Sequence, residues 1–417
     1  MPKMSKQTAI ILILVVFLGA LGALIWFYFS FNAVPVAKTP PVSTVDVYDP
    51  FGTKALDQIS AQTETLPDEI YTPDNTLTPD KLRKISEDPV SGLSIIENKK
   101  TGQTDIHYIL RANGNIYETY ADSPETKRLS ITTIPKVYES IWLPDGEKLI
   151  IRYLKDGTEN VETFSVKINP ATTTLNEFEG GVDGNHLPEN IGALAVNPLG
   201  NKLFYLTNNL NGASGFISKI DGLNKKLLFE SPLIEWLVSW PKEETITLTT
   251  KASVKIPGYM YFLNSQTGNF SRILGGINGL TTKTNKTATE ILYSDSIRTI
   301  PRLYLYNVKS GESKLLPVNT FPEKCLWSNM DSKIIYCAVP KVFPPGEYPD
   351  IWYQGLASFN DDIWLINTDT MASILVFDIQ NETANNIDAV DIQIDEKDNY
   401  LFFINKTDLT LWSLNLK

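Results

Sequence analysis

An all-β fold built from a repeated four-stranded unit is predicted by three features of this 417-residue chain. The first is a hairpin, SIWLPDGEKLIIRY at 140–153, in which two apolar strands flank a turn. The second is an alternating strand that ends at an Asn or Asp turn, as in YMYFLNSQTG at 259–268. The third is a strand that runs into a proline, as in KKLLFESP at 225–232. Four short strands per unit of about 43 residues, repeated in phase, are typical of a β-propeller.

The hairpin recurs along the chain, and its repeats define the blades. The residues placed at the position of Trp142 are Trp142, Val196, Trp240, Lys283, Trp327 and Ile394. We expect the tryptophans among them to belong to the core between blades. Counting units predicts seven blades, at 91–135, 136–180, 191–231, 235–275, 278–318, 323–380 and 388–417.

The last unit stops after three strands, and an upstream segment has the pattern of the missing fourth. This segment is KLRKIS at 81–86. We expect it to pair with the C-terminal blade and to close the ring, because closure removes edges that would otherwise pair with other chains.

A membrane anchor is predicted before the repeats. Residues 8–31 are free of charge and long enough to cross a bilayer as a helix. Lys3 and Lys6 precede the run, which favours a cytoplasmic N-terminus and an extracytoplasmic remainder. A cleaved signal peptide is the alternative, but the run is too long and NAVPVAK is a poor cleavage sequence. Prolines then punctuate a polar, acidic stretch that is predicted to be an extended stalk.

The predicted fold class is therefore all-β: a seven-bladed β-propeller preceded by one N-terminal transmembrane helix and a proline-rich stalk. The predicted organisation is a cytoplasmic N-terminus at 1–7, the anchor at 8–31, the stalk at 32–79 and the propeller at 80–417. This arrangement predicts a single-pass protein of the cell membrane.

The repeat motifs resemble those of a known family. WLPDGEKLIIRY and NPLGNKLFYL are similar to the WD40-like (PD40) repeats of TolB-type bacterial propellers. The resemblance extends from residue 81 to the end of the chain, although the Gly-His and Trp-Asp dipeptides of true WD40 repeats are missing. It implies the propeller fold and a role as a binding platform in the bacterial envelope.

The composition disfavours several classes of function. A net charge of −11 speaks against a nucleic-acid binder, whose surface normally carries a basic stripe. The two cysteines, Cys325 and Cys337, fit the two arms of one hairpin, either as a disulfide or as two buried thiols. The sequence contains no cluster of Cys and His residues, so a structural zinc site is not expected.

Catalytic signals are sparse. No G-x-S-x-G, H-E-x-x-H or phosphate-binding glycine loop occurs. We expect His107 to be a structural strand residue, and His186, near Asp183, is a weak candidate for function. Pairs of carboxylates could serve glycoside hydrolysis but also arise freely in acidic surface turns; they are Glu159/Glu162, Asp361/Asp362, Asp388/Asp391 and Asp395/Glu396. A calcium site at 395–398 is a weak hypothesis, and no other cofactor is expected.

An insertion of about 20 residues in the sixth unit, at 340–362, breaks the period. It is rich in aromatic residues and prolines, and long ordered insertions on rigid scaffolds often carry binding sites. The candidate binding residues are Tyr348, Asp350, Trp352, Tyr353, Gln354 and Asp361. The alternative is that the aromatic rings pack back on the propeller.

These features predict a membrane-anchored, extracytoplasmic module that binds or scaffolds a protein or glycan of the envelope. The alternative is an envelope-associated hydrolase or lyase that uses acidic residues at the propeller channel.

Overall fold

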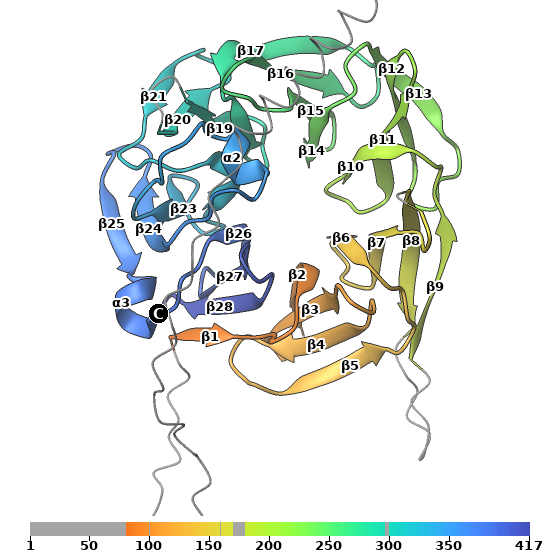
Figure 1. The fold of residues 1–417 in the computed structure, drawn as a ribbon, viewed down its shortest axis with the longest axis horizontal. Helices are drawn as coiled ribbons and strands as arrows, with labels where there is room; N and C mark the ends of the chain where they lie inside the picture. The colour runs from red at the N-terminus through yellow and green to blue at the C-terminus, as the bar shows by residue number, and fades with distance from the viewer. Residues whose placement is uncertain (1–80, 100, 159, 170–179, 297–299) are drawn as a thin grey trace, which may run out of the picture. The chain divides into compact units, whose positions relative to one another are not determined.

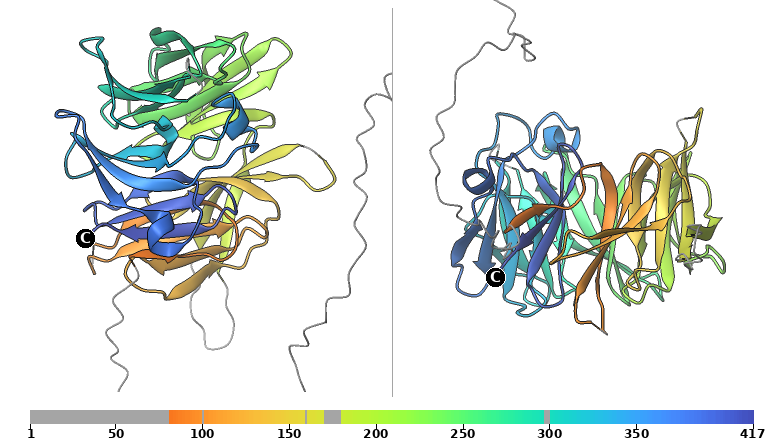
Figure 2. Two further views of the ribbon diagram at one scale, coloured as in Figure 1. Left: turned by 60° about the vertical axis from the view of Figure 1, so that its left-hand side comes forward. Right: turned by 90° about the horizontal axis from the view of Figure 1, so that it is seen from below.

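Seven four-stranded antiparallel sheets are arranged as blades around a ring in the computed structural model (Figure 1). The described residues are 81–99, 101–158, 160–169, 180–296 and 300–417. Figure 2 shows the ring from two further sides, with neighbouring sheets packed face to face. The predicted seven-bladed, all-β propeller is thereby confirmed.

Each blade except the last is formed by four consecutive strands. Blade 1 contains β2 (Val90–Glu97), β3 (Thr104–Leu110), β4 (Ile116–Tyr120) and β5 (Thr126–Ser130). Blade 2 contains β6 (Val137–Trp142), β7 (Lys148–Leu154), β8 (Val161–Asn169) and β9 (Gly181–His186). Blade 3 contains β10 (Ile191–Val196), β11 (Lys202–Asn209), β12 (Gly212–Lys219) and β13 (Lys226–Ser231). Blade 4 contains β14 (Trp236–Lys242), β15 (Thr245–Thr250), β16 (Pro257–Asn264) and β17 (Phe270–Asn278).

The remaining blades include three short helices of the described part of the chain. Blade 5 contains β18 (Thr281–Thr284), β19 (Glu290–Asp295), β20 (Arg302–Asn307) and β21 (Ser313–Leu315). Blade 6 contains β22 (Cys325–Trp327), β23 (Ile334–Pro340), β24 (Asp361–Asn367) and β25 (Ser373–Phe377), with η1 (Pro322–Lys324), α2 (Asp350–Tyr353) and α3 (Ile379–Thr383) in its connections. Blade 7 contains β26 (Ala389–Ile394), β27 (Tyr400–Asn405), β28 (Leu411–Asn415) and β1 (Leu82–Lys84).

The hydrophobic core is divided among the interfaces between blades. Apolar residues alternate along the strands, so each sheet presents apolar side chains to both neighbours. Each of the seven interfaces contains its own buried cluster. The cluster between blades 7 and 1, for example, joins Phe402 and Ile404 to Val90 and Ile106.

The ring is closed by a strand from the beginning of the described chain. Strand β1 pairs antiparallel with β28, and Leu82 lies opposite Leu414. The side chain of Leu82 is buried in the cluster between blades 6 and 7. Arg83 then connects β1 to blade 1, because its guanidinium donates to the carbonyl oxygens of Ser123 at 2.6 Å and Tyr120 at 2.5 Å.

The predicted anchor at 8–31 and stalk at 32–79 lie outside the described residues. Among the residues that are described, no helix has the length and apolar character needed to span a membrane.

The strand pairing corrects one position of the sequence repeat. Trp142, Val196 and Ile394 lie opposite the first apolar residue of the returning strand, at Leu149, Leu203 and Leu401. In blade 5 the corresponding pair is Thr284 with Ile291, so Thr284 and not Lys283 is the equivalent of Trp142. The placement of Lys283 was wrong by one residue, which moves its side chain to the other face of the sheet.

Cys325 and Cys337 lie directly opposite each other in β22 and β23 and are joined by a disulfide. Both are buried in the cluster between blades 5 and 6.

Because the bond closes a loop of 12 residues, we expect reduction to lower the free energy of unfolding by about 3 kcal/mol. Thermal unfolding with and without reductant measures this, and a Cys325→Ala/Cys337→Ala variant should not respond. Alkylation confirms that both thiols are free after reduction. If the unfolding temperature of the reduced protein is then unchanged, the disulfide does not stabilise the fold.

Candidate ligand-binding site

The insertion of blade 6 packs as a small core of its own. Tyr348 and Trp352 are only 1% and 3% exposed and cluster with Phe321 and Phe359. The ring of Trp352 stacks on Phe321 with centroids 4.9 Å apart. Buried rings cannot contact a partner, so the packing does not support the predicted aromatic contact surface and agrees with the alternative.

The other predicted binding residues are held by contacts within the chain. The carboxylate of Asp350 accepts a hydrogen bond from the Val254 amide of blade 4 at 2.8 Å. The hydroxyl of Tyr353 donates to the carboxylate of Glu323. Gln354 follows α2 and is exposed. The insertion therefore reaches from blade 6 to a loop of blade 4.

Asp361 belongs to a buried ion-pair network. The Lys324 ammonium lies 2.7 Å from Asp361 and 2.5 Å from Asp388, and none of the three side chains is exposed. The same ammonium donates to the Ala389 carbonyl at 2.9 Å, and Trp352 Nε1 donates to Asp388 at 3.0 Å. Burial raises the pKa of Asp361 to about 6, although Lys324 opposes the shift. This network fixes η1, the insertion and β26 together.

Most of the remaining candidates are held by separate contacts, although His186 Nδ1 lies 4.0 Å from the Glu162 carboxylate. The two ring nitrogens of His107 lie 2.9 Å from the Gly146 carbonyl oxygen and 3.0 Å from Glu118, which is a structural role. His186 is exposed and packs against Phe164, and Asp183 accepts from Asn169. Asp395 accepts from the amides of Asn399 and Tyr400, which satisfies it as a turn residue. Within the described segments, no group of three or more His, Cys, Asp or Glu side chains could hold a metal ion.

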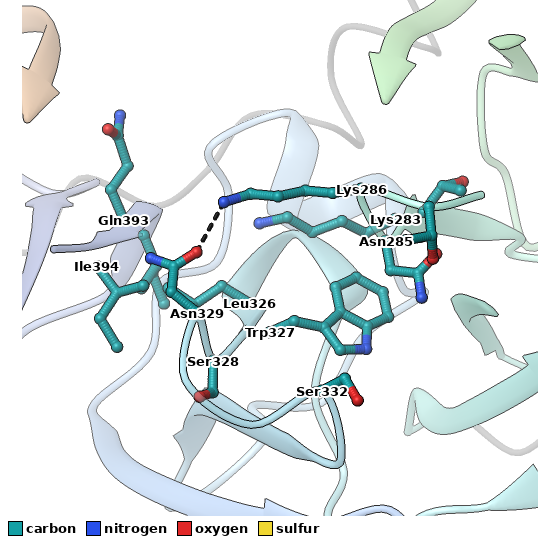
Figure 3. Close-up of a pocket in the computed structure, with 13 residues that line it drawn as sticks. Lys283, Asn285, Lys286, Leu326, Trp327, Ser328, Asn329, Ser332, Gln393 and Ile394 are labelled. Carbon is teal, nitrogen blue, oxygen red and sulfur yellow. Dashed lines mark hydrogen bonds between the residues drawn. The ribbon is translucent and has the colours of Figure 1, made fainter. Parts of the chain in front are cut away.

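A cavity of about 380 Å³ lies where blades 5, 6 and 7 meet (Figure 3). Its walls come from β18 and the turn after it, from β22 and the turn after it, and from β26. The lining residues are Lys283, Thr284, Asn285, Lys286, Thr287, Leu326, Trp327, Ser328, Asn329, Ser332, Ile392, Gln393 and Ile394. Trp327 thus lines this cavity as well as packing against the core, which extends the role predicted for it.

The turns around the cavity are fixed by hydrogen bonds. Asn285 accepts from the amides of Thr289 and Glu290, which sets the turn that carries Lys286. Asn329 donates from its side chain to the Asp395 carbonyl at 3.0 Å, and its backbone amide donates to Asp398 at 3.0 Å. The turns of blades 6 and 7 are therefore joined at the edge of the cavity.

The cavity has a charge opposite to that of the chain as a whole. Its lining includes two lysines and no acidic residue, whereas the protein carries a net charge of −11. Figure 3 shows Lys283 and Lys286 extended side by side, with their ammonium groups toward Gln393 and Asn329. Lys286 donates to the Asn329 side-chain oxygen at 2.7 Å. A cationic, amide-rich cavity with one indole ring suits a small anionic ligand.

Two carboxylates and a tyrosine lie near the cavity without lining it. Partial burial raises the pKa of Glu323, and Lys283 opposes the shift. The side chain of Asp391 is exposed. The pKa of Tyr353 is also raised, by burial and by the neighbouring Glu323 carboxylate. Asp391 lies on β26, one of the strands that Figure 1 shows on the inner side of the ring.

The cavity was not predicted from the sequence. Its residues come from three hairpins, and the one-residue error in blade 5 hid the face on which Lys283 lies. The available signal was that a lysine stands where blades 2, 3 and 6 have Ile141, Ala195 and Leu326.

The chain is similar to several solved structures, each at low sequence identity. No known family model matches the chain, and no curated protein matches its sequence. Among solved structures, an oligogalacturonate lyase in complex with manganese matches at 12% identity over 80% of this chain and 98% of that chain, with a TM-score of 0.48. TolB from Acinetobacter baumannii matches at 12% identity over 67% of this chain and 62% of that chain, with a TM-score of 0.42. The β-propeller domain of the Trilobed protease from Pyrococcus furiosus matches at 11% identity over 79% of this chain and 98% of that chain, with a TM-score of 0.47. These likenesses concern the fold alone.

Proposed function

We propose that this protein is a propeller-based binding module that takes an acidic glycan at the cavity between blades 5, 6 and 7. The observation that carries the proposal is a cavity with two lysines and no acid on an acidic protein. The ammonium groups suit a carboxylate, and the amide and hydroxyl groups suit sugar hydroxyls. The Trp327 indole offers apolar area for the face of a sugar ring.

The anchor, the location and the partner belong to the same proposal. The uncharged run at 8–31 and the two lysines before it support a membrane-anchored, extracytoplasmic propeller. An envelope location would place the cavity where acidic polymers of the cell surface are present. The resemblance of the repeats to TolB-type propellers supports the same location.

The proposal predicts selective binding of acidic sugars. We expect the full chain to bind a hyaluronan hexasaccharide, and Lys286→Met to weaken this binding by about tenfold or more, because a charge-assisted contact is lost. Isothermal titration calorimetry measures the change. Lys309→Met is the matched control, since Lys309 is an exposed turn lysine of the same blade and does not line the cavity.

Three outcomes would overturn the proposal. The first is that the full chain does not bind the hexasaccharide. The second is that the two lysine variants lose the same amount of affinity for it. The third is that a hexaglutamate peptide binds more tightly than the hexasaccharide and that Lys286→Met weakens the binding of the peptide as well. The last result would assign the cavity to an acidic protein segment instead.

A hydrolase or lyase is the second candidate, favoured by the raised pKa of Glu323, a partly buried carboxyl group beside the cavity. A carboxyl group that stays protonated at higher pH can act as a general acid. Mass spectrometry of the hexasaccharide after incubation tests this. Shortened products that are absent with Glu323→Gln would support an enzymatic function. A hexasaccharide that stays intact with the unmodified chain would exclude cleavage of this sugar.

A further inference from the structure

Lys283 occupies an unusual place in the ring. It lies on β18, at the position that carries apolar Ile141, Ala195 and Leu326 in blades 2, 3 and 6 and the uncharged Gln393 in blade 7. Its side chain is partly buried and lines the cavity. It forms no hydrogen bond or ion pair with any residue of the described segments, whereas Lys286 is held by Asn329. The amino group of Lys283 is thus accessible from the cavity and not engaged in a contact.

The charged groups around Lys283 come from three elements. Lys286 lies in the turn after β18 and extends beside it (Figure 3). Asp391 on β26 and Glu323 in η1 attract the ammonium form. Desolvation nevertheless outweighs both carboxylates and lowers the pKa of Lys283. A lysine in such surroundings is unprotonated more often than a surface lysine, and the free amine is the nucleophile.

We propose that Lys283 is a nucleophilic amine that forms an imine with a small carbonyl compound bearing a carboxylate, such as the reducing-end aldehyde of an acidic sugar. The nitrogen lone pair attacks the carbonyl carbon, and one proton passes from the nitrogen to the carbonyl oxygen to give a carbinolamine. The hydroxyl then leaves with the second nitrogen proton as water, and the nitrogen lone pair forms the C=N bond. The step is a condensation without oxidation or reduction, and the Lys286 ammonium would hold the carboxylate.

The inference rests on the proposed function only in that the cavity admits an anionic ligand. Two carbonyl probes separate the claims. Propionaldehyde is uncharged and reports on the amine alone, whereas glyoxylate carries the carboxylate that Lys286 would bind. Sodium cyanoborohydride supplies hydride that reduces each imine to a stable secondary amine. Peptide mass spectrometry on the full chain then measures the rate at each lysine.

At pH 7 we expect propionaldehyde to modify Lys283 several-fold faster than Lys286 or Lys309. This preference should shrink as the pH rises and the surface lysines also lose their protons. Glyoxylate should increase the preference, and Lys286→Met should remove that increase. The ratio of the glyoxylate rate to the propionaldehyde rate within each variant separates the carboxylate contact from any change in the amine itself. Asp391→Asn should shift the rate profile of Lys283 to lower pH, because a carboxylate that favours the ammonium form is gone.

A Lys283 that reacts with propionaldehyde no faster than Lys309 would overturn the inference, whatever the glycan titration shows. A selective reaction with propionaldehyde but no gain with glyoxylate would leave the amine in place and refute the anion site.

Discussion

Lys324→Met is expected to lower the free energy of unfolding by about 3–5 kcal/mol, because it leaves two buried aspartates without their cation. The ammonium of Lys324 contacts both Asp361 and Asp388 in a site with no exposure. A methionine fills a similar volume, so the loss would arise mainly from charge and hydrogen bonding. Chemical denaturation measures it.

Lys341→Met is the matched control for this substitution. Lys341 also lies near two aspartates, at 3.3 Å from Asp362 and 2.5 Å from Asp378, but its side chain is 24% exposed. Water can therefore replace the lost contacts, and we expect a change of about 1 kcal/mol or less. Equal losses in the two variants would contradict the account of the buried network.

The loss in Lys324→Met should also depend on pH. Burial raises the pKa of Asp361 above its unfolded value, so the folded state holds more protons than the unfolded state between pH 4 and about 6. The contribution of Asp361 to the free energy of unfolding therefore decreases as the pH rises from 4 to about 6. Removing Lys324 removes the group that opposes the shift, so the variant should be closer to wild-type stability at pH 5 than at pH 8. A larger deficit at pH 5 would contradict this sign.

Loss of β1 is the second change with a large expected effect. Deleting residues 1–85 removes Leu82 from the core and the backbone bonds from Ile85 to Leu411 and from Asn415 to Lys81. We expect a loss on the order of 5 kcal/mol and self-association through the exposed edge of β28. Thermal unfolding and sedimentation velocity measure the two effects.

Deleting residues 1–79 is the control, because it keeps β1 intact, and it should cost little. If the longer deletion fails to fold, Leu82→Ala in the full chain tests the same interface, with an expected loss of about 2–5 kcal/mol. Equal stability of the two deletions, or no loss in Leu82→Ala, would show that β1 does not hold the ring together.

The fold could be predicted because its determinants are local and repeated. Alternation along strands and Asn or Asp at turns are visible within ten residues, and each hairpin supports the next. In blade 5 the repeat alignment was wrong by one residue, because no apolar residue marks the register of TTKT at 281–284. The pairing of Thr284 with Ile291 in the structure establishes the register of β18.

The buried ion-pair network could not be predicted because its members are distant in sequence. Lys324 looks like a solvated turn lysine, and Asp361 and Asp388 look like members of surface pairs. Only folding shows that they meet in a buried network. The aromatic residues of the insertion likewise gave no sign of which way they face, and their density fits a small core as well as a binding surface.

Hydrogen–deuterium exchange of the full chain with and without the hyaluronan hexasaccharide shows where the ligand binds. We expect added protection at 282–288 and 326–333, which form the turns around the cavity, and no added protection in the insertion at 341–358. Protection confined to the insertion, or to blades 1–4, would contradict the placement of the ligand site between blades 5, 6 and 7.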